Sequence, residues 1–430
     1  MDIAALYQLF LAHPLVTTDT RKLVPGSIYF ALKGENFNGN RFALQALQQG
    51  AAYAIVDEPI DGHDERIIQV EDALHTLQEL AGYHRRQFSI PFIAITGSNG
   101  KTTTKELVSA VLAAHFTTYT TQGNLNNHIG IPLTLLRVGK DAEMAVIEMG
   151  ANHQQEIAGY CTYVQPTYGI ITNCGKAHLE GFGGIEGVRK GKGELFDFLS
   201  GHDGTAFAFA DYDYLQSMSL TVPHVIWYGT EMGLVQGKEI SSLPFLTIQT
   251  TGALEMKLST QLVGSYNLPN VLCAVTVGHF FGVPQEKIQQ AIENYTPTNS
   301  RSQWMNWHGN QVILDAYNAN PSSMKLAIEN FSRQPGERKI LLLGAMKELG
   351  EESLAEHRAL VNLIQSLQLK EVVLVGGDFG ATEHPFLYFN EADSAGKWLR
   401  EQQLQGALLL VKGSRSLQME KVLADSDSIN

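Results

Sequence analysis

The chain has 430 residues, of which 44% are hydrophobic and 17% are charged. At roughly 150 residues per domain, this length suggests about three domains, and the composition excludes a largely disordered chain. Acidic residues outnumber basic ones by 44 to 31, which gives a net charge of −13. This balance disfavours nucleic-acid binding, which needs Lys and Arg to neutralise phosphates.

Cysteine content and hydropathy indicate the compartment. The 3 cysteines are too few and too scattered for a disulfide framework or a zinc cluster, so we expect a protein of the reducing cytoplasm. No apolar run approaches the ~18 residues of a membrane span. The opening segment, MDIAALYQLFLAHPLV, has no basic region, which favours an amphipathic helix over a secretion signal.

Residues 1–88 predict a small α/β domain, because short apolar strands alternate with segments of helical periodicity. Strands are expected at 26–32 and 51–57, and helices at 41–49 and 71–87. Ser89, Ile90 and Pro91 interrupt the last helical pattern. We therefore expect a domain boundary near residue 89.

Residues 89–298 predict a central domain with a mostly parallel sheet. Apolar strands are separated by helical stretches, which is typical of a sheet covered on both faces. Strands are expected at 91–96, 142–149, 167–173 and 204–210, and helices at 101–114 and 268–281. The stretch 220–260 is rich in Thr, Ser and Gly and suggests an antiparallel patch.

Residues 299–430 repeat a strand–loop–helix unit. Near-continuous apolar strands indicate a doubly wound, Rossmann-like domain whose sheet is buried on both faces. Strands are expected at 311–317, 339–345, 371–377 and 407–413. Asn320 followed by Pro321 predicts the N-cap and first position of a helix.

A glycine-rich turn follows the first central strand and precedes a helix. Its residues are Gly97, Ser98, Asn99, Gly100, Lys101, Thr102 and Thr103. Unpaired backbone N–H groups and the helix dipole favour a phosphate there, a solvent-facing Lys101 can reach the outer phosphates, and the Thr102 hydroxyl can coordinate Mg²⁺. Glu148 ends another strand, where an acidic metal ligand is expected, although a solvated loop residue is the alternative.

Longer motifs make the chain resemble the Mur ligase family, the ATP-dependent amide-forming enzymes of peptidoglycan synthesis. The motifs are residues 123–128 (GNLNNH), 148–152 (EMGAN), 171–173 (ITN), 177–183 (AHLEGFG), 315–324 (DAYNANPSSM), 343–346 (LGAM) and 348–351 (ELGE). They are similar to those of the family's D-alanyl-D-alanine-adding member, although that member often has Asp at Ala345 and Asp-Gly-His at Asn38-Gly39-Asn40.

The resemblance implies a reaction and a set of cofactors. ATP would phosphorylate the terminal carboxylate of UDP-N-acetylmuramoyl-tripeptide, and the amine of D-alanyl-D-alanine would attack the acyl phosphate. Two Mg²⁺ ions and Lys101 would supply positive charge; Thr102 and Glu148 would hold the first ion. The second would be held by His178 and by a carbamylated Lys192, fourteen residues further on. Lys190 is the alternative register, and a solvated basic face with Arg189 is another interpretation.

Further contacts follow from the resemblance. ATP contacts beyond the phosphate loop are expected from Asn267, Asn270, Arg301 and Asp315. Asn270 also fits a helix N-cap. The UDP part would meet Thr20, Arg21 and Lys33, and the remaining substrate contacts are expected at Asn126, Asn127, Tyr317, Asn318, Lys347, Lys412, Ser414 and Arg415.

Two alternatives remain at this stage. A folylpolyglutamate-type ligase would share the phosphate loop but not the motifs at 148–152 and 317–320, and a GTPase switch would carry N-K-x-D, which is absent. The sequence does not determine whether the tripeptide's third residue is diaminopimelate or lysine. We expect a monomer that closes on its substrates, with hinges near Ser89–Pro91 and Thr296–Ser300.

Overall fold

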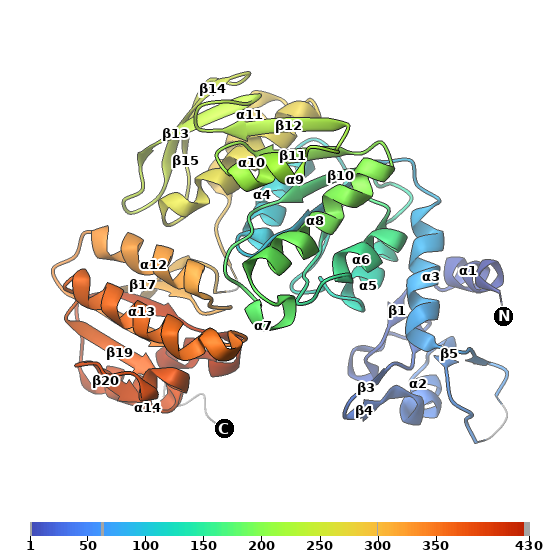
Figure 1. Cartoon of the computed structure of the whole chain (residues 1–430). Coiled ribbons are helices and arrows are strands. Elements are labelled where there is room, and N and C mark those ends of the chain that lie inside the picture. The colour runs from blue at the N-terminus through green and yellow to red at the C-terminus, as the bar shows by residue number, and fades with distance from the viewer. Residues whose placement is uncertain (1, 62–63, 299, 425–430) are drawn as a thin grey trace.

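The computed structural model describes residues 2–61, 64–298 and 300–424. Its three parts form an arch, with the N-terminal and C-terminal parts as the two feet (Figure 1). The predicted α/β class and the three-domain architecture are confirmed. Residue 299, within the second expected hinge, and residues 425–430, at the end of the third expected domain, lie outside the described residues.

The N-terminal domain contains a four-stranded parallel sheet in the order β1-β2-β5-β6. Its strands are β1 (Val16–Thr17), β2 (Ile28–Phe30), β5 (Tyr53–Val56) and β6 (Ile67–Gln69), with a hairpin of β3 (Lys33–Gly34) and β4 (Phe37–Asn38). Its helices are α1 (Ile3–Ala12), α2 (Ala43–Gln48) and α3 (Ala73–Arg85), with short 3₁₀ turns η1 (Thr20–Lys22) and η2 (Gly39–Phe42). All four elements predicted here are confirmed.

Helix α3 is fixed to the central domain. Arg85 donates from Nε to the carbonyl of Val164 at 2.9 Å and from a terminal nitrogen to that of Gln165 at 2.8 Å. Its guanidinium also lies 3.7 Å from the ring centroid of Phe92. His84 contacts the Val138 carbonyl through Nε2 at 2.9 Å. A hinge at residues 89–91 would have to break these buried contacts.

The central domain is built on a nine-stranded sheet in the order β15-β14-β13-β12-β11-β10-β7-β9-β8. The strands are β7 (Phe92–Thr96), β8 (Thr118–Thr120), β9 (Met144–Glu148), β10 (Tyr168–Ile171), β11 (Thr205–Phe209), β12 (His224–Gly229), β13 (Val235–Ser241), β14 (Thr247–Gly252) and β15 (Met256–Ser259). The expected antiparallel patch is formed by β13, β14 and β15, whereas β12 is parallel to both of its neighbours.

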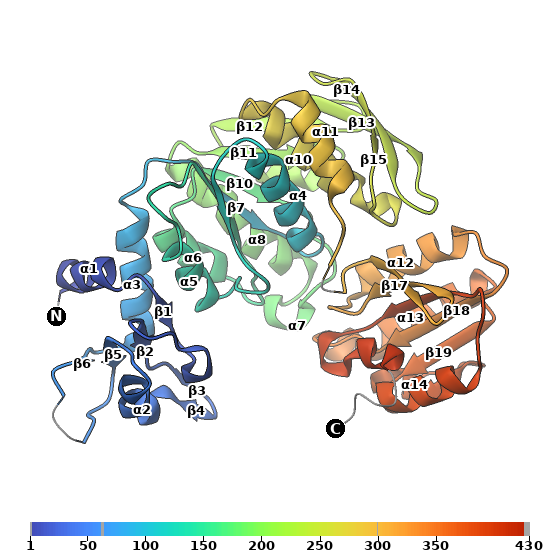
Figure 2. The ribbon, with the colours of Figure 1, turned by 180° about the vertical axis from the view of Figure 1, so that it is seen from behind.

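Helices cover both faces of this sheet, as the near-continuous apolar strands require. They are α4 (Lys101–Ala113), α5 (Gly130–Leu135), α6 (Glu156–Val164), α7 (Leu179–Phe182), α8 (Ile185–Gly201), α9 (Asp213–Met218), η3 (Ser265–Asn267), α10 (Leu268–Phe280) and α11 (Gln285–Asn294). Helices α6 and α8 lie on the face shown in Figure 1, and α4 and α10 lie on the face shown in Figure 2.

The C-terminal domain has a six-stranded sheet in the order β16-β17-β21-β18-β19-β20. Its strands are β16 (Gln303–Trp307), β17 (Asn310–Asp315), β18 (Lys339–Gly344), β19 (Glu371–Val375), β20 (Leu387–Phe389) and β21 (Leu408–Lys412). Only β16 is antiparallel within it. Its helices are α12 (Pro321–Arg333), α13 (Ser353–Ser366) and α14 (Ala392–Glu401), with 3₁₀ turns η4 (Gly350–Glu352), η5 (Gly377–Ala381), η6 (Arg415–Leu417) and η7 (Met419–Leu423).

The largest apolar core runs through all three domains, from Leu6 in α1 to Leu410 in β21. The predicted cap of α12 is confirmed: Asn320 accepts a hydrogen bond from the backbone N–H of Ser323 at 2.9 Å, with Pro321 at the first position. Within the described ranges, no helix combines the length and the apolar character that crossing a membrane requires.

Candidate active site

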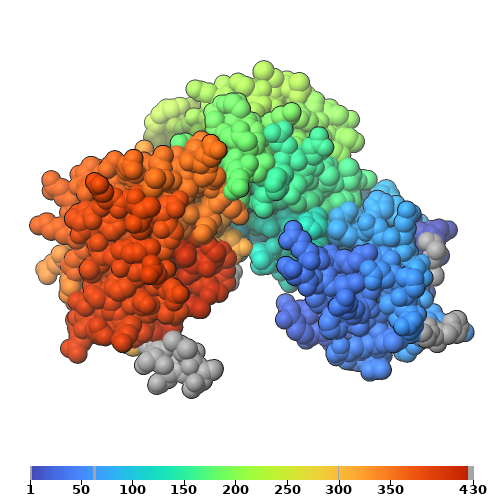
Figure 3. Space-filling model, turned by 60° about the horizontal axis from the view of Figure 1, so that its bottom comes forward, coloured from blue at the N-terminus to red at the C-terminus, as the bar shows by residue number. Residues whose placement is uncertain are grey.

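A cavity of about 860 Å³ lies between the central and C-terminal domains. Its lining comes from loops that follow β7, β9, β10 and β17, together with the start of α10 and of α12. Figure 3 looks into the hollow between the two feet of the arch, beneath the central domain. Ligands of α/β sheets bind outside the carboxyl ends of strands, so this cleft is the candidate active site.

The glycine-rich turn forms a braced phosphate loop at the floor of the cleft. Gly97 has a φ of +141°, and a Cβ there would lie 2.0 Å from the Thr172 hydroxyl oxygen, so a side chain does not fit. Asn173 braces the loop by accepting from the backbone N–H of Ser98 at 2.9 Å and of Asn99 at 3.0 Å. No side chain caps α4 after Gly100. Its first N–H groups therefore face the cleft as an anion site.

Lys101 is half-buried and lines the cleft, with its ammonium folded back onto the loop. Its ammonium donates to the carbonyl of Gly97 at 2.6 Å and to that of Ser98 at 3.3 Å. Burial lowers the pKa of Lys101 to about 8, although Glu148 acts in the opposite direction. Lys101 is the first residue of α4, so its side chain stands beside the uncapped start of that helix.

Glu148 and Thr102 form a compact oxygen-rich site. The Thr102 hydroxyl donates to the two carboxylate oxygens of Glu148 at 3.1 and 3.0 Å. Asn126 donates to the same carboxylate at 2.7 Å. Glu148 is only 1% exposed, so the alternative of a solvated loop residue is wrong. Such hard oxygen donors suit Mg²⁺.

A ready-made metal cluster is absent from the ranges 2–61, 64–298 and 300–424, where no three His, Cys, Asp or Glu side chains are placed to hold a metal ion. A cation bound near Glu148 would therefore need other oxygens to complete its coordination. Mg²⁺ commonly uses one or two carboxylates together with substrate phosphates. The arrangement of Thr102 and Glu148 beside the anion site fits that pattern.

Lys192 is buried inside the central domain, at 1% exposure. Its ammonium donates to the carbonyl of Ala151 at 2.9 Å, and Ala151 lines the cleft. Burial lowers the pKa of Lys192 to about 7, and the nearby charge of Lys101 adds to the effect. Lys190, two residues earlier on α8, is exposed. The solvated-face interpretation is therefore wrong for Lys192, and Lys190 does not reach the interior.

His178 lines the cleft just after β10 and bridges two domains. Its Nδ1 contacts the carboxylate of Glu348 in the C-terminal domain, and this contact lowers the pKa of that carboxyl. Nearby, Lys176 forms an interdomain ion pair with Glu356 at 2.5 Å. The pairing of Nδ1 leaves Nε2 of His178 as the nitrogen for a metal. Histidines that bind metals commonly have their other nitrogen held by a carboxylate.

The residues expected near ATP all line the cleft: Asn267, Asn270, Arg301 and Asp315. Asn270 is the third residue of α10, not its cap, so the N-cap alternative is wrong. It bonds the Thr104 hydroxyl at 3.1 Å instead. The Arg301 guanidinium stacks on the ring of Tyr317, 3.6 Å from its centroid. Together these residues form one polar wall beside the phosphate loop.

The residues expected to contact the other substrates divide into two groups. Asn126, Asn127, Tyr317, Asn318 and Lys412 line the cleft. Lys412 is 2% exposed and paired with Asp315 at 2.6 Å. Lys347, Ser414 and Arg415 are not among the residues that line it.

The UDP candidates Thr20, Arg21 and Lys33 lie apart from the cleft, in the N-terminal domain. Arg21 pairs with Asp19 at 2.9 Å, and Lys33 pairs with Asp57 at 3.2 Å. Asp57 also bonds Asn40 in both directions, at 2.7 and 3.0 Å. Asn40 is 3% exposed, so the unusual Asn-Gly-Asn stretch has a structural role.

Several cleft residues had no predicted role. Asn173 braces the phosphate loop, and Tyr212 and Tyr214 line the same cavity. Asn320, predicted only as a helix cap, also donates to Asn99 at 2.7 Å. Asn173 belongs to the motif at 171–173, and that motif is the sequence feature from which its role could have been predicted. The two tyrosines lie outside any motif, and no local pattern marks them.

Family profiles match three consecutive stretches. They are described as the catalytic domain of the Mur ligase family (residues 14–85), the Mur ligase middle domain (95–278) and the Mur ligase glutamate ligase domain (300–415). The chain is 37% identical to the UDP-N-acetylmuramoyl-tripeptide–D-alanyl-D-alanine ligase of Escherichia coli (strain K12), over 95% of this chain and 92% of that protein.

Solved structures share the fold over nearly the whole length. MurF from Thermotoga maritima in complex with ADP has a TM-score of 0.86 and 27% identity, covering 96% of this chain and 97% of that one. The UDP-N-acetylmuramoylalanyl-D-glutamyl-2,6-diaminopimelate–D-alanyl-D-alanyl ligase of Acinetobacter baumannii has a TM-score of 0.85 and 32% identity, covering 97% of both chains.

Proposed function

The chain belongs to the Mur ligase family, and on this premise we propose that it joins D-alanyl-D-alanine to UDP-N-acetylmuramoyl-tripeptide at the expense of ATP. The observation that carries this function is 37% identity with a ligase of that specificity over 95% of the chain. The product would be the pentapeptide precursor of peptidoglycan, with ADP and phosphate. The reaction thus serves cell-wall synthesis, on which cell shape and division depend.

The chemistry has two balanced steps. A terminal carboxylate oxygen of the tripeptide attacks the γ-phosphorus of ATP, the bond to ADP breaks, and an acyl phosphate forms. The neutral amine of D-alanyl-D-alanine then attacks the acyl carbon and loses a proton. The carbon–oxygen bond breaks, and phosphate leaves with the oxygen that came from the carboxylate. The two reactants of the first step are both anionic, so the site must supply positive charge.

The phosphate loop supplies part of that charge. The N–H groups after Gly100 would bind the outer phosphates of ATP, and Lys101 would turn from the loop carbonyls toward them. Asn267, Asn270, Arg301 and Asp315 would hold the adenosine end and phosphates. The ADP complex of the Thermotoga maritima relative supports ATP as the nucleotide.

Thr102 and Glu148 would hold a first Mg²⁺ through hydroxyl and carboxylate oxygens. The fit rests on the donor set, because all the groups are hard oxygens beside the anion site. When bound, Mg²⁺ neutralises developing charge on the phosphate oxygens. Asn126 keeps the carboxylate in its orientation by donating to it.

We propose that His178 and a carbamylated Lys192 hold a second Mg²⁺. The amine of Lys192 would add to the carbon of CO₂ and lose a proton, which leaves an anionic N-carboxylate. Burial supports this, because only a neutral amine reacts and the pKa of Lys192 is lowered to about 7. A carbamate also replaces a buried cation by an oxygen ligand, which suits Mg²⁺.

The substrates would meet the outer domains. Thr20, Arg21 and Lys33 are proposed to bind the UDP part, with the exposed Arg21 and Lys33 exchanging their carboxylate partners for phosphates. Asn126 and Asn127 would contact the peptide in the cleft. Tyr317, Asn318, Lys347, Lys412, Ser414 and Arg415 remain the candidates for D-alanyl-D-alanine and for closure on the acyl phosphate.

Further assignments complete the proposal. We infer domain boundaries at 1–88, 89–298 and 299–430, because each of the three main sheets falls within one of these ranges.

We take diaminopimelate as the third residue of the tripeptide substrate, since it stands in the name of the Acinetobacter baumannii relative. We also propose a monomer that works in the cytoplasm, where ATP is available.

Mass spectrometry of the reaction products tests the function. The protein is incubated with ATP, Mg²⁺, the diaminopimelate-containing UDP-muramoyl-tripeptide and D-alanyl-D-alanine. We expect a product whose mass is that of UDP-muramoyl-tripeptide plus that of D-alanyl-D-alanine less one water. One ADP should form per turnover. ATP hydrolysis without that product, or ligation of glutamate to a folate instead, would contradict the assignment.

A further inference from the structure

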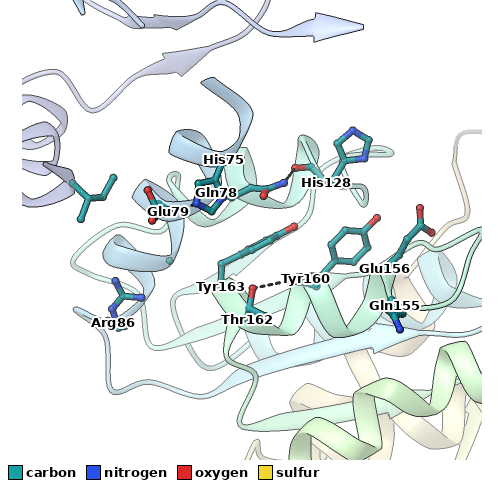
Figure 4. A pocket seen from close by; sticks show the side chains of 13 residues that line it. His75, Gln78, Glu79, Arg86, His128, Gln155, Glu156, Tyr160, Thr162 and Tyr163 are labelled. Carbon is teal, nitrogen blue, oxygen red and sulfur yellow. Dashed lines mark hydrogen bonds and ion pairs between the residues drawn. The ribbon is translucent and has the colours of Figure 1, made fainter. Parts of the chain in front are cut away.

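A second cavity, of about 450 Å³, lies between α3 of the N-terminal domain and α6 of the central domain. We call it the α3–α6 groove (Figure 4). Its polar lining includes His75 and Glu79 on α3, Arg86 at the C-cap of α3, and His128, Glu156 and Tyr160 on the central domain. None of these six side chains has a role in the reaction described above.

The groove opens onto the cleft that contains the phosphate loop. His128, Glu156 and Tyr160 line both cavities. At this junction, Nε2 of Gln78 donates to the carbonyl of His128 at 3.1 Å, as drawn in Figure 4. His128 directly follows Asn127 of the cleft. A substrate that extends from the N-terminal domain to the γ-phosphate therefore passes the mouth of the groove.

One wall of the groove offers positive charge. The side chain of Arg86 makes no hydrogen bond or ion pair with any other residue that the structure describes; its guanidinium lies 5.6 Å from the ring centroid of Tyr83. Helix α3 also presents His75, whose side chain is 68% exposed. An unpaired guanidinium in a cavity favours a carboxylate, with which it forms two parallel hydrogen bonds.

The α3–α6 groove also presents negative charge, from Glu79 on α3 and from Glu156 on α6. Glu79 has one ionic contact, to His75 at 3.5 Å, and is 53% exposed. Glu156 accepts backbone hydrogen bonds from Asn152 and His153 through Oε2, at 2.6 and 3.0 Å. Its Oε1 has only a distant contact with the His153 ring, at 3.8 Å. The groove therefore presents carboxylate oxygens with free capacity as well as a free guanidinium.

We propose that the α3–α6 groove receives the side chain of the tripeptide's third residue and selects an end group that carries both an ammonium and a carboxylate. This rests on the proposed function. The carboxylate that reacts belongs to the third residue itself, so that residue's side chain branches from the backbone inside the cleft. The groove is the neighbouring cavity that shares lining residues with the cleft.

Charge matching makes diaminopimelate the occupant. Glu79 binds its terminal ammonium, and Arg86, at the same end of the groove in Figure 4, binds its terminal carboxylate. A lysine side chain satisfies Glu79 but leaves Arg86 without an anion. Discrimination between the two side chains therefore depends on Arg86, whereas Glu79 contributes to binding of both.

Steady-state kinetics with two substrates tests this. The substrates are UDP-muramoyl-tripeptides that differ only in a third residue of diaminopimelate or lysine. We expect the unchanged enzyme to prefer diaminopimelate. Arg86→Gln should lower kcat/KM for the diaminopimelate substrate about tenfold, through KM, as expected for one charged hydrogen-bonded pair, and leave the lysine substrate within about twofold. Glu79→Gln should raise KM for both, with the KM for ATP unchanged.

Arg66→Gln is the matched control, because Arg66 is an exposed arginine of the same domain, paired with Asp64 and outside the groove. It should behave as the unchanged enzyme. An Arg86→Gln enzyme that keeps the original preference, or an unchanged enzyme with no preference, overturns the groove assignment. Failure of the unchanged enzyme to ligate either tripeptide overturns the proposed function instead, so the two failures are distinguishable.

Discussion

Asn320, at the start of α12, donates a hydrogen bond from Nδ2 to Oδ1 of Asn99 in the phosphate loop, at 2.7 Å. The other end of the same side chain caps its own helix, since Oδ1 accepts from the N–H of Ser323 at 2.9 Å. One side chain, 8% exposed, therefore joins the C-terminal domain to the proposed nucleotide site. The position of that domain and the conformation of the loop are physically coupled.

Replacing Asn320 by Asp separates its two roles. Asp caps a helix about as well as Asn, so stability should change little. It cannot donate to Asn99, and it would place a carboxylate against an oxygen near the phosphates. We expect kcat/KM for ATP to fall about tenfold, the loss of roughly one hydrogen bond. Asn362→Asp, an exposed position on α13, makes the same charge change and should have no effect; equal rates for both variants would disprove the coupling.

Lys101→Ala should abolish ligation and leave the fold intact. The ammonium bonds only loop carbonyls among the described residues, and its proposed partners are phosphates. Loss of such a group commonly costs about 10²–10³ in rate. Phosphate release and circular dichroism measure the two effects. Lys140→Ala, at an exposed position, is the control. Near-normal turnover of the Lys101→Ala enzyme would show that Lys101 does not bind phosphate.

Lys192 should be essential as a carbamate and not as a cation. Lys192→Ala and Lys192→Arg should both lose most activity, and a small carboxylate such as formate should partly restore the alanine variant only. Lys190→Ala, two residues away on α8 and exposed, should stay active. An active Lys192→Arg enzyme would mean that positive charge suffices.

The carbamate also predicts a dependence on pH and CO₂. Because burial lowers the pKa of Lys192 to about 7, the reactive neutral amine predominates above that pH and declines below it. In CO₂-depleted buffer, activity should therefore fall most below the pKa, and bicarbonate should restore it. Identical rates with and without bicarbonate on both sides of the pKa would contradict the proposal.

Domain closure should occur between the central and C-terminal domains. The contacts of His84 and Arg85 hold α3 on the central domain, so the N-terminal side should move less. Spin labels on the exposed residues Gln49, Lys140 and Lys397 measure how far the central domain lies from each of the two outer domains. With ADP and tripeptide bound, we expect the Lys140–Lys397 distance to shorten and the Gln49–Lys140 distance to stay constant. The opposite pattern would place the hinge near residues 89–91.

Local patterns predicted much of this fold. Apolar runs located β7, β9 and β17, and the Asn320–Pro321 pair located the start of α12, because burial and capping are determined by neighbouring residues. Strand β16 was missed, since its sequence QWMNW lacks the apolar continuity of a central strand. It lies at the edge of its sheet and pairs only with β17, so mixed polarity is tolerated there.

Features that depend on distant residues were harder to predict. Helix α8 contains four glycines, which lower helix propensity. For two of them the reason is packing against α7: a Cβ on Gly187 or Gly191 would lie 1.8 or 2.5 Å from atoms of Phe182. The Phe182 ring also covers Lys192, whose Nζ lies 4.8 Å from the ring centroid. The contact of Asn320 with Asn99 likewise joins residues 221 positions apart, a distance that no local pattern covers.

The central claim is that a carboxylate is activated as an acyl phosphate in the cleft and then captured by an amine. It is tested most directly by using UDP-muramoyl-tripeptide labelled with ¹⁸O in its terminal carboxylate, together with ATP and D-alanyl-D-alanine, and measuring the label in the released phosphate. The account predicts one ¹⁸O in each phosphate formed from a fully labelled carboxylate, with the other retained in the new amide. Unlabelled phosphate accompanying ATP turnover would contradict it.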